Sequence, residues 1–183
     1  MKHNRLVVMM EIAMMTGLAV ILDFVRVAQM PFGGSITLAA VPLILLAFRR
    51  GAGAGITAGV IFGIINWMIG GYVVHWAQML LDYPVAFGVL GTAGFFAFKR
   101  SWTLKRKLTA VIAGTIVANL LRLASHFTAG VVWFRELAPD GMSPELYSFL
   151  YNIAYIGPII VITILIMVLI VRTGERLFHP ETS

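Results

Sequence analysis

The C-terminal part of the chain contains the stretch Ile159-Ile-Val-Ile-Thr-Ile-Leu-Ile-Met-Val-Leu-Ile-Val171, in which no side chain is charged. Such runs predict helices that cross a membrane, each using about 20 apolar residues. The rest of the sequence has the same character, because 60% of its 183 residues are hydrophobic, 12% are charged and the mean hydropathy is +0.91. Six such helices would use roughly 120 residues, which leaves no room for a second domain. The sequence therefore predicts an all-α integral membrane protein, with residues 1–183 forming one compact bundle of six transmembrane helices.

Six apolar runs are separated by proline, glycine or basic residues, which favour connections between helices. We expect the six membrane spans at residues 6–28, 36–48, 53–71, 73–98, 108–134 and 145–171. The second run is the shortest. Ser143 before Pro144 is a typical start signal for the last helix.

The basic residues indicate how the bundle is oriented, because Lys and Arg gather in the cytoplasmic connections of membrane proteins. The connections on the side of the N-terminus hold eleven of the fourteen basic residues, namely Lys2, Arg5, Arg49, Arg50, Lys99, Arg100, Lys105, Arg106, Lys107, Arg172 and Arg176. The opposite connections hold only Arg26 and Arg135. We therefore expect a multi-pass protein of the cell membrane with both termini in the cytoplasm. This bias also explains the net charge of +6 without a nucleic-acid partner.

The sequence lacks the residues that several chemical functions need. The chain has no cysteine, and no His/Glu pattern typical of a metal site occurs. The segment Gly51-Ala-Gly-Ala-Gly55 is glycine-rich, but no Lys-Ser/Thr pair follows it as in a nucleotide-binding loop. Gly55, Gly59 and Gly63 instead continue at helical spacing, which predicts close packing against another helix. We expect no ATPase activity, no metal and no cofactor.

The first predicted helix carries small residues on one face. Ala13 and Gly17 lie one turn apart, with Thr16 beside them. Small residues at this spacing let two helices approach closely, either inside the bundle or between the bundle and a partner. The sequence leaves both possibilities open.

An ionisable residue inside a membrane span costs free energy and usually faces a partner or a water-filled cavity, and three such residues stand out. Asp82 lies early in the fourth helix, and Arg122 and His126 lie one turn apart on one face of the fifth. All three fall in the outer half of the membrane. An ion pair between Asp82 and Arg122 that joins two helices is one interpretation, and a ligand site is the other.

Aromatic and amide side chains gather at the same depth and favour the ligand site. They include Tyr72, Tyr83, Trp133, Tyr147, Tyr151 and Asn152. Some of these rings suit the aromatic belt at the membrane surface. A carboxylate surrounded by aromatic faces nevertheless suits a flat organic cation, because ring quadrupoles and the anion replace the water that the cation loses. Pro84 directly follows Asp82 and Tyr83, so a kink there would aim both side chains inward.

Five segments carry a resemblance to a known family. They are Gly33-Gly-Ser-Ile-Thr-Leu-Ala-Ala-Val-Pro42, Phe48-Arg-Arg-Gly-Ala-Gly-Ala-Gly55, Leu81-Asp-Tyr-Pro-Val-Ala-Phe87, Arg122-Leu-Ala-Ser-His-Phe127 and Tyr147-Ser-Phe-Leu-Tyr-Asn152. In this order they resemble the ThiT-type substrate-binding component of bacterial energy-coupling-factor transporters, which is specific for thiamine. The resemblance implies a six-helix protein that binds the vitamin near the outer surface. It also implies partners, namely a transmembrane coupling protein of the EcfT type and two ATPase subunits that supply the energy.

The resemblance also implies roles for particular residues. Asp82 occupies the position of an acidic residue, Glu in the family, that faces the cationic thiazolium. The other implied ligand contacts are Tyr72, Tyr83, His126, Tyr147, Tyr151, Asn152 and either Trp133 or Phe134. Ala13 and Gly17 would form the docking face for the coupling protein. The uncharged connection from Gln29 to Ser35 is the expected lid over the site.

Two other functions remain open at this stage. A related component for another small vitamin or precursor would share the fold and the docking face. An intramembrane enzyme could use Asp82 and His126 as acid and base, although the sequence offers no nucleophile motif.

Overall fold

The computed structural model describes residues 2–179, which form six helices and a small hairpin. Five of the six helices are α1 (Lys2–Phe24), α2 (Ala40–Arg50), α3 (Ala52–Gly70), α6 (Leu104–Trp133) and α7 (Pro144–Thr173). The remaining helix, fourth in chain order, is broken into α4 (Trp76–Leu80), the π-helix η2 (Leu81–Val85), α5 (Ala86–Gly88) and the 3₁₀-helix η3 (Val89–Phe96). The hairpin joins β1 (Ala28–Gln29) to β2 (Ser35–Ile36) through η1 (Pro31–Gly33). Short 3₁₀ turns η4 (Arg135–Leu137) and η5 (Glu175–Phe178) follow α6 and α7.

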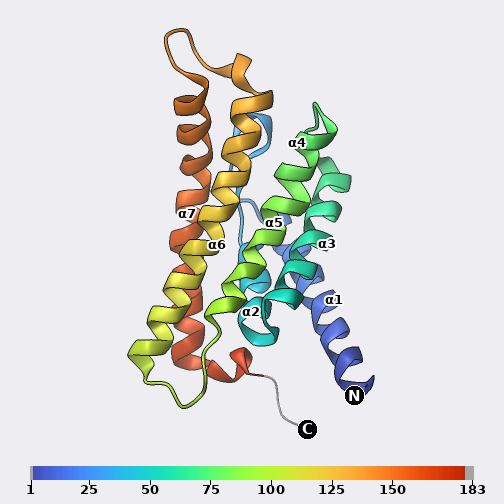
Figure 1. Ribbon diagram of the computed structural model, residues 1–183, viewed down its shortest axis with the longest axis vertical. Helices are drawn as coiled ribbons and strands as arrows, with labels where there is room; N and C mark the ends of the chain where they lie inside the picture. Colours follow the sequence, from blue (N-terminus) through green and yellow to red (C-terminus); the bar gives the residue numbers. More distant parts are fainter. Residues whose placement is uncertain (1, 180–183) are drawn as a thin grey trace.

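The six-helix bundle predicted from the sequence is confirmed for residues 2–179 (Figure 1). In this part of the chain five helices are long and apolar enough to cross a membrane. Helix α2 has only 11 residues, or about 16 Å of length, so it does not cross a membrane alone. The first helix ends at Phe24 rather than at the predicted residue 28, because the chain turns there into β1.

Helix α2 forms the centre of the bundle. All residues from Ala40 to Phe48 are buried, and α1, α3, η3 and α7 pack around them. By contrast, α7 exposes Val161, Leu165 and Leu169 on its outer face, where lipid would cover them. The short helix thus takes the place that a protein core has in a soluble domain, while the longer helices face the membrane.

Helix α3 packs backbone to backbone against the broken helix, as its glycine spacing predicted. A Cβ atom added at Gly59 would lie 2.2 Å from the Phe87 carbonyl oxygen. A Cβ atom added at Gly91 would lie 2.1 Å from the Ile56 backbone nitrogen. Neither distance leaves room for a side chain, so the approach of the two helices depends on these glycines.

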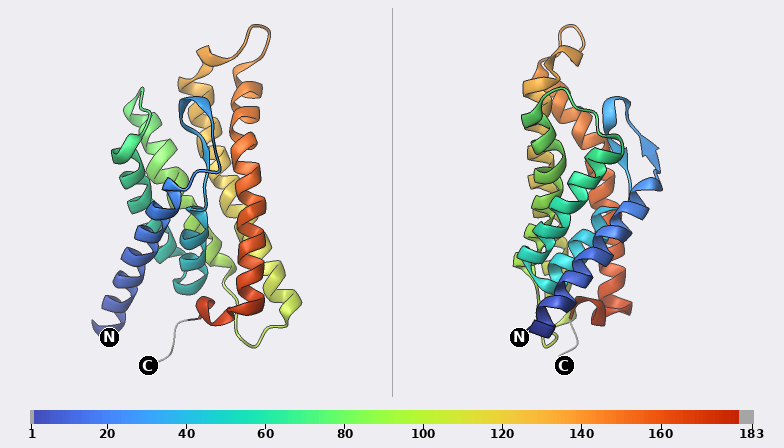
Figure 2. Two further views of the ribbon diagram at one scale, coloured as in Figure 1. Left: turned by 180° about the vertical axis from the view of Figure 1, so that it is seen from behind. Right: turned by 90° about the vertical axis from the view of Figure 1, so that its right-hand side faces the viewer.

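Helix α1 lies at the outside of the bundle and is held by polar contacts near its middle and at its C-terminal end (Figure 2). Near the middle, Glu11 accepts hydrogen bonds from Arg50 at 2.6 Å and from Arg49 at 3.1 Å. At the C-terminal end, Asp23 accepts hydrogen bonds from Asn66 at 2.6 Å and from Thr37 at 3.1 Å. These contacts position a helix that buries little of its own surface.

The small residues of α1 face away from the bundle. Ala13 and Gly17 are exposed, and nothing lies within 4 Å of a Cβ atom placed at Gly17. Thr16 and Ala19, on the side of the helix that faces the bundle, are buried. Of the two possibilities left open by the sequence, the structure therefore does not show packing within the bundle.

The start of α1, the connection from η3 to α6 and the turn η5 lie at one end of the bundle (Figure 1). This end carries the basic residues that the sequence places on the side of the N-terminus. That this end faces the cytoplasm stays a prediction from the charge distribution.

Candidate functional site

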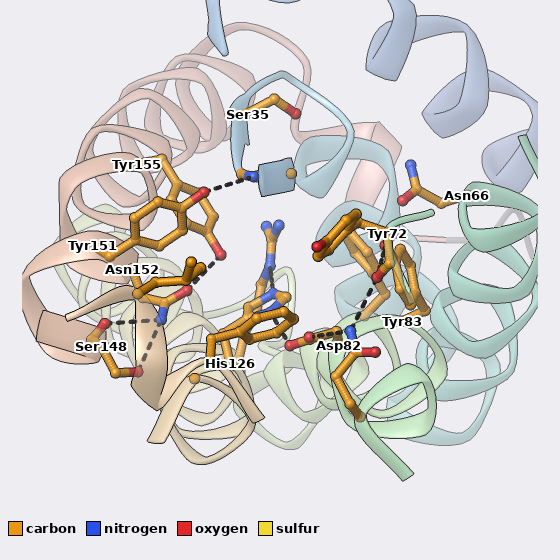
Figure 3. Close-up of a pocket in the computed structure, with 18 of the residues that line it drawn as sticks. Ser35, Asn66, Tyr72, Asp82, Tyr83, His126, Ser148, Tyr151, Asn152 and Tyr155 are labelled. Atoms are coloured by element: carbon orange, nitrogen blue, oxygen red, sulfur yellow. Dashed lines mark hydrogen bonds and ion pairs between the residues drawn. The ribbon is translucent and has the colours of Figure 1, made fainter. Parts of the chain in front are cut away.

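A cavity opens at the other end of the bundle. The hairpin, η2, α6 and α7 surround it, and Figure 3 shows the side chains that point into it. The wall combines charged, amide and aromatic side chains, so the cavity is suited to a polar organic ligand.

The π-helix η2 places Asp82 at this cavity. Pro84 has no backbone N–H, so the regular α-helical hydrogen bonding is interrupted there. The Leu81 carbonyl in this wider turn still has hydrogen-bond donors. It accepts from the Ala86 N–H and, at 2.7 Å, from the Ser125 hydroxyl. Single π turns of this kind are frequent at functional sites. The expectation that Pro84 aims Asp82 and Tyr83 inward agrees with their place in the cavity wall.

Two neighbouring side chains hold the Asp82 carboxylate in place. Gln78 Nε2 donates to Asp82 Oδ2 at 2.7 Å, and His126 Nδ1 lies 2.8 Å from Asp82 Oδ1. The side chain of Asp82 is still 16% exposed, so part of it remains open to the cavity. The carboxylate is therefore oriented before any ligand arrives.

The hydrogen bonds indicate which nitrogen of His126 carries its proton. Arg122 Nε donates to His126 Nε2 at 3.4 Å, and a guanidinium N–H can only donate. His126 Nε2 therefore accepts, and Nδ1 carries the hydrogen that is donated to Asp82. In this arrangement His126 is a neutral imidazole, so it orients the Asp82 carboxylate without neutralising its negative charge.

The interpretation of Asp82 and Arg122 as an ion pair is wrong. Within the described part of the chain no ion pair joins the two residues, because His126 lies between them. The guanidinium of Arg122 instead packs over the Phe87 ring, 4.5 Å from its centre, and the residue is only 6% exposed. Among the described residues, no Lys or Arg therefore forms an ion pair with the Asp82 carboxylate.

Aromatic rings form opposite walls of the cavity (Figure 3). On one side, Tyr72 and Phe134 lie with ring centres 5.9 Å apart. On the other side, α7 contributes a row of tyrosines, with centres 6.0 Å apart for Tyr147 and Tyr151 and 6.1 Å apart for Tyr151 and Tyr155. The space between these walls suits a flat ring system.

Most of the residues predicted for the site line the cavity. They are Tyr72, Asp82, Tyr83, His126, Phe134, Tyr147, Tyr151 and Asn152. Trp133 is not part of this lining, because it stacks on His75 with ring centres 5.4 Å apart and an angle of 21°. Of the two aromatic residues that the sequence left as alternatives, the structure therefore places Phe134 at the cavity.

The hairpin lies at the cavity where the sequence predicted a lid, because Gly33, Gly34 and Ser35 belong to the cavity lining. The Tyr151 hydroxyl donates to the Pro31 carbonyl and accepts from the Gly34 N–H at 3.4 Å. Gly34 also lies against the Tyr155 ring, where a Cβ atom would come within 2.7 Å. The tyrosine row of α7 therefore holds the hairpin against the mouth of the cavity.

Sequence reasoning missed several lining residues, including Asp23, Asn66, Gln78, Ser148 and Tyr155. Asp23 lies within the span predicted at residues 6–28, so its cost in a membrane was the signal that could have found it. Asn152 donates to the Ser148 carbonyl at 2.8 Å and accepts from the Tyr155 hydroxyl at 2.8 Å. These partners fix the orientation of the Asn152 amide at the cavity wall.

The charges of the cavity favour a cation. Its described lining contains two carboxylates, Asp23 and Asp82, and one guanidinium, Arg122. With His126 neutral, the formal sum is −1, so a ligand with one positive charge would balance it. Aromatic walls beside these carboxylates favour an organic cation as the ligand class. Among residues 2–179 no group of three or more His, Cys, Asp or Glu side chains is arranged to hold a metal ion.

Comparison with known proteins gives consistent matches over the whole chain. The family model described as Thiamine transporter protein (Thia_YuaJ) matches residues 9–179. The chain is 38% identical over 190 residues to the thiamine transporter ThiT of Bacillus subtilis (strain 168), covering 100% of this chain and 99% of the relative. It is 28% identical over 186 residues to the thiamine transporter ThiT of Lacticaseibacillus paracasei, covering 97% and 92%. A solved structure of ThiT from Listeria monocytogenes is similar with a TM-score of 0.89 at 25% identity, covering 97% of this chain and 100% of that chain.

Proposed function

Because the chain belongs to the thiamine transporter protein family, we propose that its cavity binds thiamine and that the chain is the substrate-binding component of a vitamin importer. The observation that carries the proposal is a carboxylate that Gln78 and His126 orient between two aromatic walls and that pairs with no Lys or Arg among residues 2–179. Thiamine has a cationic thiazolium ring and a flat aminopyrimidine ring, so one molecule presents both features that the cavity complements.

Each part of the cavity has a role in this proposal. Asp82 supplies the counter-charge for the thiazolium, while Tyr72, Phe134 and Tyr147 form the walls on which the rings stack. His126, Tyr83 and Asn152 provide polar contacts to the aminopyrimidine, and Tyr151 fastens the lid. Thiamine is carried as cargo, and the chain performs no chemistry on it and requires no cofactor.

Capture requires the hairpin to move. In the described structure the hairpin is held by Tyr151 and Tyr155, so thiamine enters when these contacts open and is enclosed when they form again. The hairpin lies at the end of the bundle away from the basic connections. With the termini in the cytoplasm, the cavity therefore receives thiamine from outside the cell.

Release into the cell requires partners. The chain would depend on a transmembrane coupling protein of the EcfT type and two ATPase subunits for energy. The exposed small residues Ala13 and Gly17 on α1 are the proposed docking face, since they leave room for a second helix to approach closely.

One titration tests the proposal. Purified protein is titrated by calorimetry with thiamine, thiamine monophosphate and riboflavin. We expect one thiamine per chain and no binding of riboflavin, which lacks the fixed cationic ring. Binding of another vitamin in place of thiamine would contradict the proposal in favour of a related transporter component. Recovery of a chemically altered ligand would favour an intramembrane enzyme that uses Asp82 and His126.

The positions of Trp133 and Phe134 give a second prediction. Phe134→Ala removes a ring from the cavity wall and should weaken thiamine binding about threefold to tenfold, the size of an aromatic contact. Trp133→Ala removes a ring that stacks on His75 outside the cavity and should change the dissociation constant less than about twofold. Calorimetry on both variants checks this, and a larger loss from Trp133→Ala would assign the stacking role to Trp133.

A further inference from the structure

A second hollow lies towards the end of the bundle that carries the termini, and it shares no lining residue with the thiamine cavity. It is an open groove between the end of η3 and the first turns of α6. Phe96, Ala110 and Ala113 form its apolar part. Lys105 and Arg106 stand at its rim together with Trp102. None of these residues takes part in the proposed binding of thiamine.

The charge of the groove is positive and is not balanced by the residues around it. None of the described residues that line it is acidic. Lys107, by contrast, turns inward and forms an ion pair with Glu175 at 2.7 Å, so it does not contribute to the rim. Arg106 lies 3.7 Å above the centre of the Trp102 ring, which holds its guanidinium in place and leaves its N–H groups available.

The groove lies where a membrane span ends. The two candidate spans that border it end at Phe96 and begin at Leu104. Helix α6 has 30 residues and is therefore about 45 Å long, while the hydrocarbon core of a bilayer measures about 30 Å. The first turn of α6, with Lys105 and Arg106, thus reaches the level of the lipid headgroups, whereas Ala113 lies at the level of the acyl chains.

We propose that this groove binds one anionic phospholipid from the leaflet on the side of the termini. The phosphate lies between Lys105 and Arg106, and the first part of an acyl chain lies against Phe96, Ala110 and Ala113. Basic pockets between helices on this side of a membrane are suited to anionic headgroups, whereas a zwitterionic lipid would bring its own positive charge to the rim. The lipid would fasten the start of α6, the helix that carries Arg122 and His126 to the thiamine cavity.

Native mass spectrometry of the full chain tests the proposal, with phosphatidylglycerol and phosphatidylcholine added separately to the detergent solution. We expect one retained phosphatidylglycerol and little retained phosphatidylcholine. The double variant Lys105→Gln/Arg106→Gln should lower the retained phosphatidylglycerol by about tenfold or more, since each basic residue near an anionic lipid surface is worth about 1 kcal/mol. The matched control, Lys99→Gln/Arg100→Gln, removes the same charge from the same connection outside the groove and should retain the lipid.

A second variant separates shape from charge. Ala113→Phe fills the apolar part of the groove and keeps both basic residues, so it should also lower phosphatidylglycerol retention. Thiamine binding by each variant shows that the chain is folded. Unchanged retention in the Lys105/Arg106 variant, or an equal loss in the Lys99/Arg100 control, would overturn the proposal, because binding would then reflect net charge alone. The proposal would also be overturned if the Lys105/Arg106 variant retained the lipid but no longer assembled with the energising module. The groove would then be a protein interface.

Discussion

Replacing Asp82 by Asn raises the dissociation constant for thiamine at least about tenfold. The variant keeps the size of the side chain and an oxygen that can accept from His126, but it removes the counter-charge for the thiazolium. Close charge pairs that are shielded from water have coupling energies from about 1.5 kcal/mol upward, and about 1.4 kcal/mol corresponds to a factor of ten. Calorimetric titration of purified Asp82→Asn with thiamine measures the loss.

The control for this variant is Asp140→Asn. Asp140 is exposed in the connection between η4 and α7, at the same end of the bundle as the cavity, and it is not part of the cavity lining. Its replacement removes the same charge and should leave the dissociation constant unchanged. An unaltered affinity in Asp82→Asn would remove Asp82 from the binding site. An equal loss of affinity in both variants would show that the effect comes from the overall electrostatic potential of the protein and not from a contact between Asp82 and thiamine.

The second large effect concerns stability, and it follows from the glycines of α3. Gly59→Ala places a methyl group 2.2 Å from the Phe87 carbonyl oxygen, and neither backbone can move away cheaply. Overpacking of this kind costs about 1–3 kcal/mol, so we expect the unfolding temperature to fall by roughly 3–10 °C. Thermal unfolding of the detergent-solubilised protein, followed by tryptophan fluorescence, measures the change.

Gly53→Ala is the matched control, because Gly53 lies on the same helix and nothing lies within 4 Å of its added Cβ atom. Alanine is favoured over glycine in helices by about 1 kcal/mol, so this variant should be as stable as the parent or slightly more stable. If Gly59→Ala unfolded at the same temperature as Gly53→Ala, α3 and the broken helix would not pack as closely as described.

The helices could be predicted from the sequence because lipid imposes a simple requirement on length and polarity. The run that ends at Val171 is long, apolar and bounded by charge, and α7 follows it closely. The close packing of α3 was also predictable, since glycine at every fourth position leaves one face of a helix without side chains. The break at η2 was only partly foreseeable: Pro84 indicated a kink, but a π turn depends on partners such as Ser125 that come from another helix.

The sequence predicted those site residues whose ionisable side chains cost free energy inside a membrane and therefore stand out. Asp82 and His126 stand out in apolar runs, and the structure brings them within 2.8 Å. Asp23 was missed although the span predicted at residues 6–28 contains it, because the sequence does not show that this side of the helix faces the cavity. The choice between Trp133 and Phe134 depends on the last turn of α6, where adjacent residues point about 100° apart, and a sequence does not fix that rotation.

The central claim is that the Asp82 carboxylate faces the positive charge of bound thiamine. The most direct measurement compares thiamine with an analogue in which a neutral thiophene ring replaces the thiazolium, using the parent chain and Asp82→Asn. We predict that the parent prefers thiamine by at least about tenfold and that Asp82→Asn binds the two compounds with nearly equal affinity. Equal binding by the parent, or an undiminished preference in the variant, would contradict the claim.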